Sequence, residues 1–262
     1  MTYSTLRLEI QDGIGWLTLA RPRRFNPIGL ATARELGQAL GELRGEASVR
    51  AVVLAGEGRA FSAGGDVAEF HREIERAPAF LAELVGHLHA AIALLLDMPK
   101  PVIASVGGVV AGGGMGLFLA ADLAVAAESA SFVMAYTGIG ASPDGGSTFF
   151  LPRLVGTRRA MELVLTNRRL GAREALAWGL VNDVVPDADL GSAVRSLAAR
   201  LASGPTQAFA QARMLLRRSF ASTSAAQLEQ ETRSLVAMAA TADFREGVTA
   251  FVEKRPPVFT GH

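Results

Sequence analysis

Two glycine-dense turns hold the residues of this chain best suited to chemistry. Residues 59–66 read RAFSAGGD and residues 111–116 read AGGGMG, and each turn follows a run of apolar, strand-like residues. Glycine and alanine let a ligand approach the main chain closely, and a helix that starts there leaves N–H groups unpaired with a partial positive charge. Two such turns can present amide N–H groups to one oxygen, which is the design of an oxyanion hole.

The second turn also has the glycine spacing that begins a dinucleotide-binding loop. Gly112, Gly114 and Gly116 lie between a strand-like run and a helical pattern. The G-x-G-x-x-G fingerprint would need a further glycine at the position of Leu117, and it normally opens a Rossmann domain. The spacing therefore argues against nucleotide binding at this turn.

Charge and composition exclude several classes of function. The 262 residues include 26 basic and 25 acidic side chains, so nothing indicates a nucleic-acid surface or an acidic tail. The pair Arg217 and Arg218 is interpreted as part of a solvated helix face. The chain has no cysteine, which excludes disulfides and thiolate sites, and its four histidines lack the spacing of metal ligands.

The sequence also gives an expectation about location. The first residues are polar and acidic, and they lack the apolar segment of a signal peptide. No uninterrupted apolar run approaches the ~20 residues that a membrane helix needs. We therefore expect a cytoplasmic protein with no membrane and no nucleic acid among its partners.

Hydrophobic periodicity predicts the elements that position the two turns. Alternation on either side of Asp12 and Gly13 predicts a β-hairpin. The predicted hairpin strands cover 7–10 and 15–19, the predicted helices 30–43 and 83–96, and three further strands 49–55, 102–106 and 123–127. Because strands alternate with helices, we expect an α/β fold with a buried, largely parallel sheet.

The chain after residue 156 is predicted to be almost wholly helical. The helical patterns cover 158–165, 172–178, 190–202, 206–219, 225–240 and 243–253. Ser203, Gly204 and Pro205 predict a break, because glycine ends one helix and proline can open the next. We therefore expect a core domain over 1–203 and a C-terminal helical module over 204–262. Residues 67–79 are polar and weakly patterned, and we expect a mobile flap there.

Six short motifs occur in the order and spacing of one known family. They are FSAGGD at 61–66, KPVIA at 100–104, GGG at 112–114, ADL at 121–123, LPRLVG at 151–156 and AWGLV at 177–181. The ordered set resembles the enoyl-CoA hydratase/isomerase, or crotonase, family from about residue 5 to the C-terminus. The resemblance implies a ClpP/crotonase-like spiral of ββα units with a C-terminal helical part that packs homotrimers, often paired into dimers of trimers. It also implies an acyl-CoA thioester as substrate, with no cofactor beyond the CoA of the substrate itself.

By the same resemblance, the oxyanion donors are the N–H groups of Ala63 and Gly113. Negative charge gathers on the thioester oxygen when a proton leaves the neighbouring carbon, and donors about 2.7–3.1 Å away stabilise it. Phe61, Gly64 and Gly112 are expected to lie beside the substrate in the same two turns. The alternative to an oxyanion hole is that both segments are only tight turns.

The general acid and base are where this chain departs from the best-known members. Hydratases of the family carry two glutamates, and the matching positions here are Gly116 and Tyr136. Such a hydratase needs both carboxylates to activate water and to deliver a proton to carbon. That mechanism is therefore unsupported, and Tyr136 is expected either to orient substrate or to pack.

One carboxylate remains in this part of the motif frame, that of Asp144. The equivalent acid serves in several isomerases and dehalogenases of the family, including ring-1,2-epoxyphenylacetyl-CoA isomerases, which this chain resembles at 132–135, 143–144 and 243–248. A single carboxylate suits a proton shift, because it can take a proton from one carbon and return it to another. The alternative is that Asp144 only caps the helix that begins near Gly145.

Three basic residues are candidates for binding CoA. Arg23 and Arg24 match the family segment that lies along the pantetheine and diphosphate, and Lys254 resembles a C-terminal basic residue that reaches the nucleotide of its own or a neighbouring subunit. Point charges suit phosphate, although exposed basic residues are also common on any surface. Asp66 follows the first turn, where it is expected to border the substrate or to cap the next helix.

The sequence as a whole predicts an acyl-CoA isomerase. We expect it to shift a double bond, or to rearrange an unsaturated or epoxide ring as in phenylacetate breakdown, through a thioester enolate with Asp144 as the only proton carrier. The alternatives are an enoyl-CoA hydratase of fatty-acid metabolism and a CoA-thioester-binding protein without chemistry.

Overall fold

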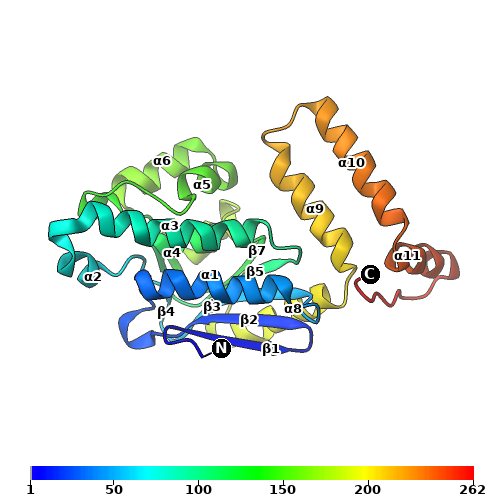
Figure 1. Cartoon of the computed structure of the whole chain (residues 1–262), viewed down its shortest axis with the longest axis horizontal. Coiled ribbons are helices and arrows are strands. Elements are labelled where there is room, and N and C mark those ends of the chain that lie inside the picture. Colours follow the sequence, from blue (N-terminus) through cyan, green and yellow to red (C-terminus); the bar gives the residue numbers. More distant parts are fainter. Residues whose placement is uncertain (1) are drawn as a thin grey trace.

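Two β-sheets lie in the core of the computed structural model, which describes residues 2–262 and is drawn in Figure 1. The larger sheet has six strands in the order β1-β2-β3-β5-β7-β10, and the smaller has four in the order β4-β6-β8-β9. The strands of the larger sheet are β1 (Leu6–Gln11), β2 (Ile14–Leu19), β3 (Ala51–Gly56), β5 (Val102–Val106), β7 (Leu123–Ala127) and β10 (Asp183–Val185). Those of the smaller sheet are β4 (Ala60–Ser62), β6 (Val109–Ala111), β8 (Ser131–Val133) and β9 (Leu170–Gly171).

The predicted hairpin is confirmed, and so is the parallel sheet beside it. β1 pairs antiparallel with β2 through a turn in which Asp12 and Gly13 have φ values of 53° and 74°. Two successive positive φ values are typical of the two-residue turn whose twist matches the flanking strands. From β2 onward the larger sheet is parallel, as expected from short apolar runs separated by helices.

A ββα unit recurs along the chain. A strand of the larger sheet is followed at once by a strand of the smaller sheet and then by a helix: β3, β4 and α2 (Val67–Arg72), then β5, β6 and α4 (Gly113–Leu119), then β7, β8 and α5 (Ser147–Val155). In the first two units the link between the short strand and the helix is a glycine turn. The predicted spiral of ββα units is therefore confirmed.

Helices cover both faces of the larger sheet. α1 (Leu30–Gly45) and α3 (Ala77–Leu96) pack against each other, and α8 (Leu190–Ala202) lies against β3, β5 and β7. The buried side chains form one large cluster that includes α1 and α3 and a smaller cluster beneath α8. The remaining helices are α6 (Thr157–Thr166) and α7 (Ala172–Ala177), with 3-10 turns at Pro22–Arg24, Ile74–Arg76, Thr137–Ile139 and Asp187–Asp189.

The helix that contains α3 is longer and more apolar than the sequence analysis implied. Residues 74–96 reach a mean hydropathy of 1.8, which is enough by length and composition to cross a membrane. Phe80, Leu84, Leu88 and Leu95 on this helix are buried in the protein core. A core helix of a soluble protein can meet the same criterion, and the packing against α1 accounts for the buried part of this one, a third of its apolar window.

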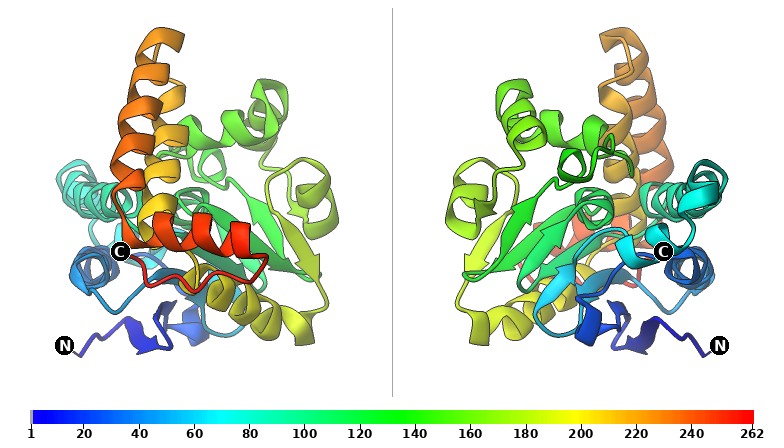
Figure 2. Two further views of the ribbon diagram at one scale, coloured as in Figure 1. Left: turned by 90° about the vertical axis from the view of Figure 1, so that its right-hand side faces the viewer. Right: turned by 90° about the vertical axis from the view of Figure 1, so that its left-hand side faces the viewer.

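The C-terminal helices project from the core. α9 (Thr206–Ser219) and α10 (Ser224–Ala239) rise as an antiparallel pair, and α11 (Ala242–Glu253) crosses near their base (Figure 2). Arg213 and Arg217 on α9 both pair with Asp122, at 2.5 and 2.8 Å. The expectation that Arg217 belongs to a solvated face was therefore wrong, because its guanidinium joins α9 to the core. The domain boundary near residue 203 stays a prediction, and Met1 lies outside the described residues.

The structure also contains elements where the sequence predicted none. Residues 67–76, expected to be part of a mobile flap, form α2 and a 3-10 turn, because Asp66 caps α2 by accepting a hydrogen bond from Glu69 N. The region after 156 also contains β9 and β10, which add strands at the edges of the two sheets. Strands of two and three residues are too short to show an alternating pattern.

Candidate active site

The two glycine turns pack against each other, main chain to main chain. A β-carbon placed on Gly64 would lie 2.8 Å from Ala111 O, and one placed on Gly114 would lie 2.7 Å from the β-carbon of Ser62. Both distances are too short for a real side chain, so only glycine allows this approach. Because a β-carbon on Gly113 would lie 3.8 Å from Gly65 N, these two residues face each other across the contact.

Each turn offers one amide N–H group at this contact. Gly113 is the first residue of α4, where helix geometry leaves the N–H without an intrahelical partner. Gly65 forms an isolated parallel bridge with Ile28 that uses Gly64 O and Asp66 N, so its own N–H is not part of the bridge. Within residues 2–262, neither N–H has a hydrogen-bond acceptor. The two turns therefore bring two unbonded N–H groups close together, and paired backbone donors of this kind are the parts of an oxyanion hole.

Ala63, predicted as the first donor, does not fit that role in this structure. Its N–H donates to Phe25 O at 2.8 Å. An amide already bonded to a carbonyl cannot also receive a thioester oxygen without breaking that bond. The available donor of the first turn is that of Gly65, two residues later, whereas Gly113 matches its prediction in being unpaired.

The other predicted residues of the turns have structural contacts. Phe61 is 1% exposed and packs in the core, so its side chain cannot contact a ligand. The Gly64 N–H donates to Ser62 Oγ and the Gly112 N–H to Val133 O. Gly64 and Gly112 therefore shape the two turns, and neither contributes a free donor.

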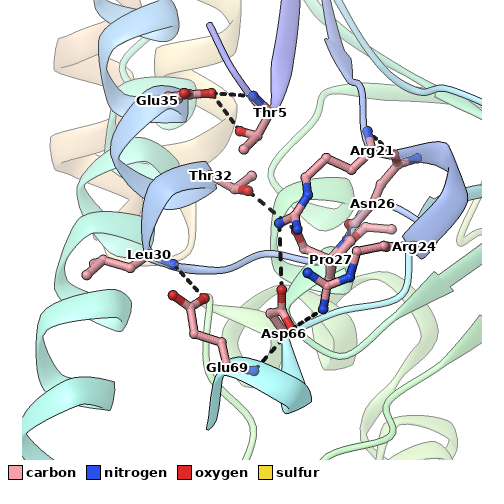
Figure 3. Close-up of polar contacts among 11 residues, drawn as sticks. Thr5, Arg21, Arg24, Asn26, Pro27, Leu30, Thr32, Glu35, Asp66 and Glu69 are labelled. Atoms are coloured by element: carbon pink, nitrogen blue, oxygen red, sulfur yellow. Dashed lines mark hydrogen bonds and ion pairs between the residues drawn. The ribbon is translucent and has the colours of Figure 1, made fainter. Parts of the chain in front are cut away.

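Asp66 joins the first turn to the arginine-rich segment before α1 (Figure 3). The carboxylate is only 4% exposed, and it accepts hydrogen bonds from Arg24 Nη2 at 2.8 Å and from Glu69 N at 3.2 Å. Arg21 lies 3.6 Å away on the other carboxylate oxygen. The predicted helix cap is thus confirmed, and the charge of Arg24 is already paired. Arg23 is exposed and has no ion-pair partner among the described residues.

Asp144 and Tyr136 lie together beside the second turn. Tyr136 Oη donates to Asp144 Oδ1 at 2.5 Å. Burial, followed by the neighbouring Asp144 charge, raises the pKa of Tyr136 well above its usual value, so the phenol stays protonated. The alternative that the Asp144 carboxylate caps α5 is not what the structure shows, because the N-cap is Gly146 and no side chain caps this helix.

Gly116 explains how Asp144 is held near the glycine turn. A β-carbon on Gly116 would lie 2.7 Å from Gly145 O and 2.9 Å from Gly145 Cα. The main chain next to Asp144 therefore packs directly on α4, three residues after Gly113. The position at which the hydratases carry glutamate has no space here for any side chain.

A histidine that the sequence analysis set aside also contacts this segment. His89 on α3 accepts a hydrogen bond from Gly145 N through Nε2 at 3.1 Å. The imidazole therefore contacts the residue that directly follows Asp144, although His89 and Gly145 are 56 residues apart in sequence. No local pattern around His89 could have indicated this contact.

Lys254 lies far from the first glycine turn of its own chain. It ends α11 with a φ of 56° and is exposed. Figure 1 shows α11 at the opposite end of the molecule from α2, which follows the first turn directly. In the described part of the chain, no three His, Asp or Glu side chains are grouped as a metal site.

Comparisons with known proteins identify the family of the chain. Residues 9–262 match the family model described as enoyl-CoA hydratase/isomerase. A protein of Rhodobacter capsulatus, described as a probable enoyl-CoA hydratase, is 44% identical, with 100% of each chain covered. The 1,2-epoxyphenylacetyl-CoA isomerase of Escherichia coli is 36% identical, with 97% of each chain covered.

A solved structure has the same fold as this chain. The protein of Streptomyces coelicolor A3(2) superimposes with a TM-score of 0.95 at 37% identity, covering 100% of this chain and 96% of the other. Both the sequence relatives and this structure match over essentially the full length of the chain. The chain therefore belongs to the enoyl-CoA hydratase/isomerase family.

Proposed function

We propose that this enzyme is an acyl-CoA isomerase that works through a thioester enolate. The observation that carries the proposal is a pair of unpaired amides, Gly65 N–H and Gly113 N–H, beside a single carboxylate, Asp144, with no space for a second carboxylate at Gly116. The family acts on acyl-CoA thioesters.

The reaction follows from where charge develops. Asp144 takes a proton from one carbon near the thioester, and the electrons move onto the thioester oxygen. The Gly65 and Gly113 N–H groups stabilise that oxygen, at about 2.7–3.1 Å. Asp144 then returns the proton to another carbon, so that the double bond or ring is rearranged without net gain of water.

Tyr136 holds the carboxylate of Asp144 in place during this cycle. Its hydroxyl donates a hydrogen bond to Asp144 Oδ1 at 2.5 Å. When Asp144 holds the substrate proton, the phenol remains neutral because of its raised pKa. Tyr136 thus orients the carboxylate oxygen that carries the proton, and it does not itself take the proton.

Hydration is the second candidate, and several comparisons favour it, since relatives and the Streptomyces coelicolor structure carry hydratase descriptions. The relative from Rhodobacter capsulatus is described as a probable enoyl-CoA hydratase. Activation of water by paired carboxylates would need a second acid near Asp144, but Gly116 and Tyr136 supply none. We therefore place hydration below isomerisation, with a ring-epoxide acyl group, as in the Escherichia coli relative, as one candidate substrate.

The CoA part of the substrate and the assembly belong to the same proposal. We assign Arg23, which is exposed and unpaired in the described chain, to the CoA phosphates, and Arg24 to holding the loop through Asp66. Lys254 would reach the nucleotide of a neighbouring subunit. A homotrimer is supported by exposed apolar side chains on the C-terminal helices, among them Leu216, Leu228, Leu235 and Phe251.

Turnover of three substrate types tests the proposed function. Wild type and Asp144→Asn are assayed with a 3-enoyl-CoA, a 2-enoyl-CoA and an epoxyphenylacetyl-CoA. We expect isomerisation by the wild type and a loss of ~10²–10⁴-fold in Asp144→Asn, which is the size of a general acid–base contribution. Unchanged isomerisation in the variant would remove Asp144 from the mechanism. Hydration of the 2-enoyl-CoA as the main activity would favour the hydratase, and tight binding without turnover would favour the binding protein.

A further inference from the structure

The first glycine turn is bonded along one side to residues 21–28, which we call the strap. Phe25 O accepts from Ala63 N at 2.8 Å, Ile28 N donates to Gly64 O at 2.7 Å, and Ile28 O accepts from Asp66 N at 3.1 Å. These bonds use the amide groups on both sides of Gly65 and leave its own N–H free. The strap therefore decides which N–H of the turn is available.

Asn26 is the buried residue that fixes the strap to the core. It is 1% exposed, and its side-chain amide donates to Glu57 O at 3.0 Å and to Ala60 O at 2.8 Å. Its Oδ1 accepts from Arg21 N at 2.8 Å (Figure 3). The side chain thus ties the start of the strap to the residues that lead into β4 and to the first residue of that strand.

The main chain of Asn26 continues this connection into the turn. Ser62 Oγ donates to Asn26 O at 2.8 Å, and Ser62 Oγ also accepts a hydrogen bond from Gly64 N at 3.1 Å. Ser62 is fully buried, and its β-carbon is the atom against which Gly114 of the second turn packs. One set of hydrogen bonds therefore links the strap, the first turn and the contact with the second turn.

The strap holds an unfavourable backbone conformation at this point. Phe25 and Asn26 have φ values of 60° and 54°, a left-handed region that asparagine tolerates and phenylalanine rarely adopts. Such conformations persist only where the surrounding contacts enforce them, and they concentrate at functional sites. The three side-chain hydrogen bonds of Asn26 enforce this one, together with the backbone bonds from Phe25 N to Pro22 O and from Asn26 N to Arg21 O.

We infer that Asn26 is a positioning residue that aims the Gly65 N–H at the substrate oxygen. Without its side-chain bonds, the strap can relax out of the left-handed conformation, and the paired main chain of residues 63–66 moves with it. A displacement of about 1 Å at a catalytic group can cost ~10²-fold in rate. The expected loss of rate rests on the proposed function. The role of Asn26 in fixing the geometry of the first glycine turn does not.

Two substitutions separate the side-chain bonds from the backbone conformation. Asn26→Gly permits the left-handed conformation without steric cost but removes the side-chain bonds that hold the strap in it, and Asn26→Asp keeps the shape of the side chain but removes both donated bonds. We expect kcat for isomerisation to fall about 100-fold in both, with KM changed less than about threefold. Asn182→Ala is the matched control, because Asn182 Oδ1 also accepts a backbone N–H, from Ala124 in β7. It should lose comparable stability without the loss in kcat.

Amide hydrogen exchange of the ligand-free enzyme gives a readout that does not depend on the reaction. We expect exchange of the Ala63 and Gly64 amides to accelerate at least about tenfold in Asn26→Gly, and not in Asn182→Ala, because their acceptors depend on the strap. Ser62→Ala, which leaves Asn26 in place, should accelerate Gly64 alone. Unchanged exchange together with unchanged kcat would overturn the inference. Accelerated exchange in an enzyme whose wild type shows no isomerisation would uphold it and contradict the proposed function.

Discussion

At the scale of single residues, the chemistry depends on which polar groups remain unpaired. The glycine turns and Asp144 could be identified from the sequence, because their residue types and spacing are distinctive. The choice between Ala63 and Gly65 could not, because it depends on Phe25 O and Ile28, which pair with the turn from a distant part of the chain. The contact of His89 could not be predicted for the same reason, since its partner Gly145 is remote in sequence.

The two tyrosines of the chain give a direct test of the residue environments. Burial and the Asp144 charge raise the pKa of Tyr136, and burial and Glu42 raise the pKa of Tyr3 to about 12. Since an unfolded tyrosine titrates near pH 10, we expect no phenolate absorbance in the folded protein as the pH passes 10. In Tyr136→Phe, the remaining tyrosine should titrate near pH 12.

The raised pKa values of Tyr3 and Tyr136 also predict how the stability of the fold changes with pH. The unfolded chain releases its phenol protons near pH 10 while the folded chain keeps them, so the unfolded state binds fewer protons above that pH. Stability contributed by these groups is therefore complete below pH 10 and declines as the pH rises further. The decline measured by denaturant unfolding should be shallower in Tyr136→Phe and in Tyr3→Phe than in wild type. A decline of equal slope in all three proteins would contradict the assigned environments.

At the scale of elements, the periodic segments could be predicted and the contacts between them could not. The hairpin, α1 and most helices after residue 156 follow their apolar patterns closely. The cap supplied by Asp66 could be predicted, but the extent of α2 could not, because its residues are polar and weakly patterned. The packing of α4 on the segment around Gly145 had no signal except the absence of a side chain at Gly116.

The contact between α4 and Gly145 can be tested by adding one methyl group. Gly116→Ala should destabilise the fold by about 1–3 kcal/mol, because overpacking forces the main chain apart, and it should lower the isomerisation rate by moving Asp144. Gly37→Ala in α1 is the matched control, since nothing lies within 4 Å of its added carbon. Alanine there should be neutral or slightly stabilising, as expected in a helix. Equal unfolding free energies for the two variants would refute the packing argument.

At the scale of the whole molecule, the C-terminal helices present apolar side chains that one chain does not cover. Leu235 and Val236 on α10 are 65% and 67% exposed. We expect light scattering to give the mass of a trimer or a dimer of trimers. The double variant Leu235→Glu with Val236→Glu should form smaller species, whereas Ile10→Glu on β1 should leave the mass unchanged. A monomeric wild-type protein would exclude a role for a neighbour's Lys254.

The most direct test of the enolate site is a crystal structure with an acyl-CoA analogue bound. The account predicts a thioester oxygen about 2.7–3.1 Å from both Gly65 N and Gly113 N, with Ala63 N still bonded to Phe25 O. The Asp144 carboxylate should lie within hydrogen-bond reach of the carbon positions that exchange the proton. A thioester oxygen bound by Ala63 N, or an Asp144 carboxylate out of reach of those carbons, would contradict it.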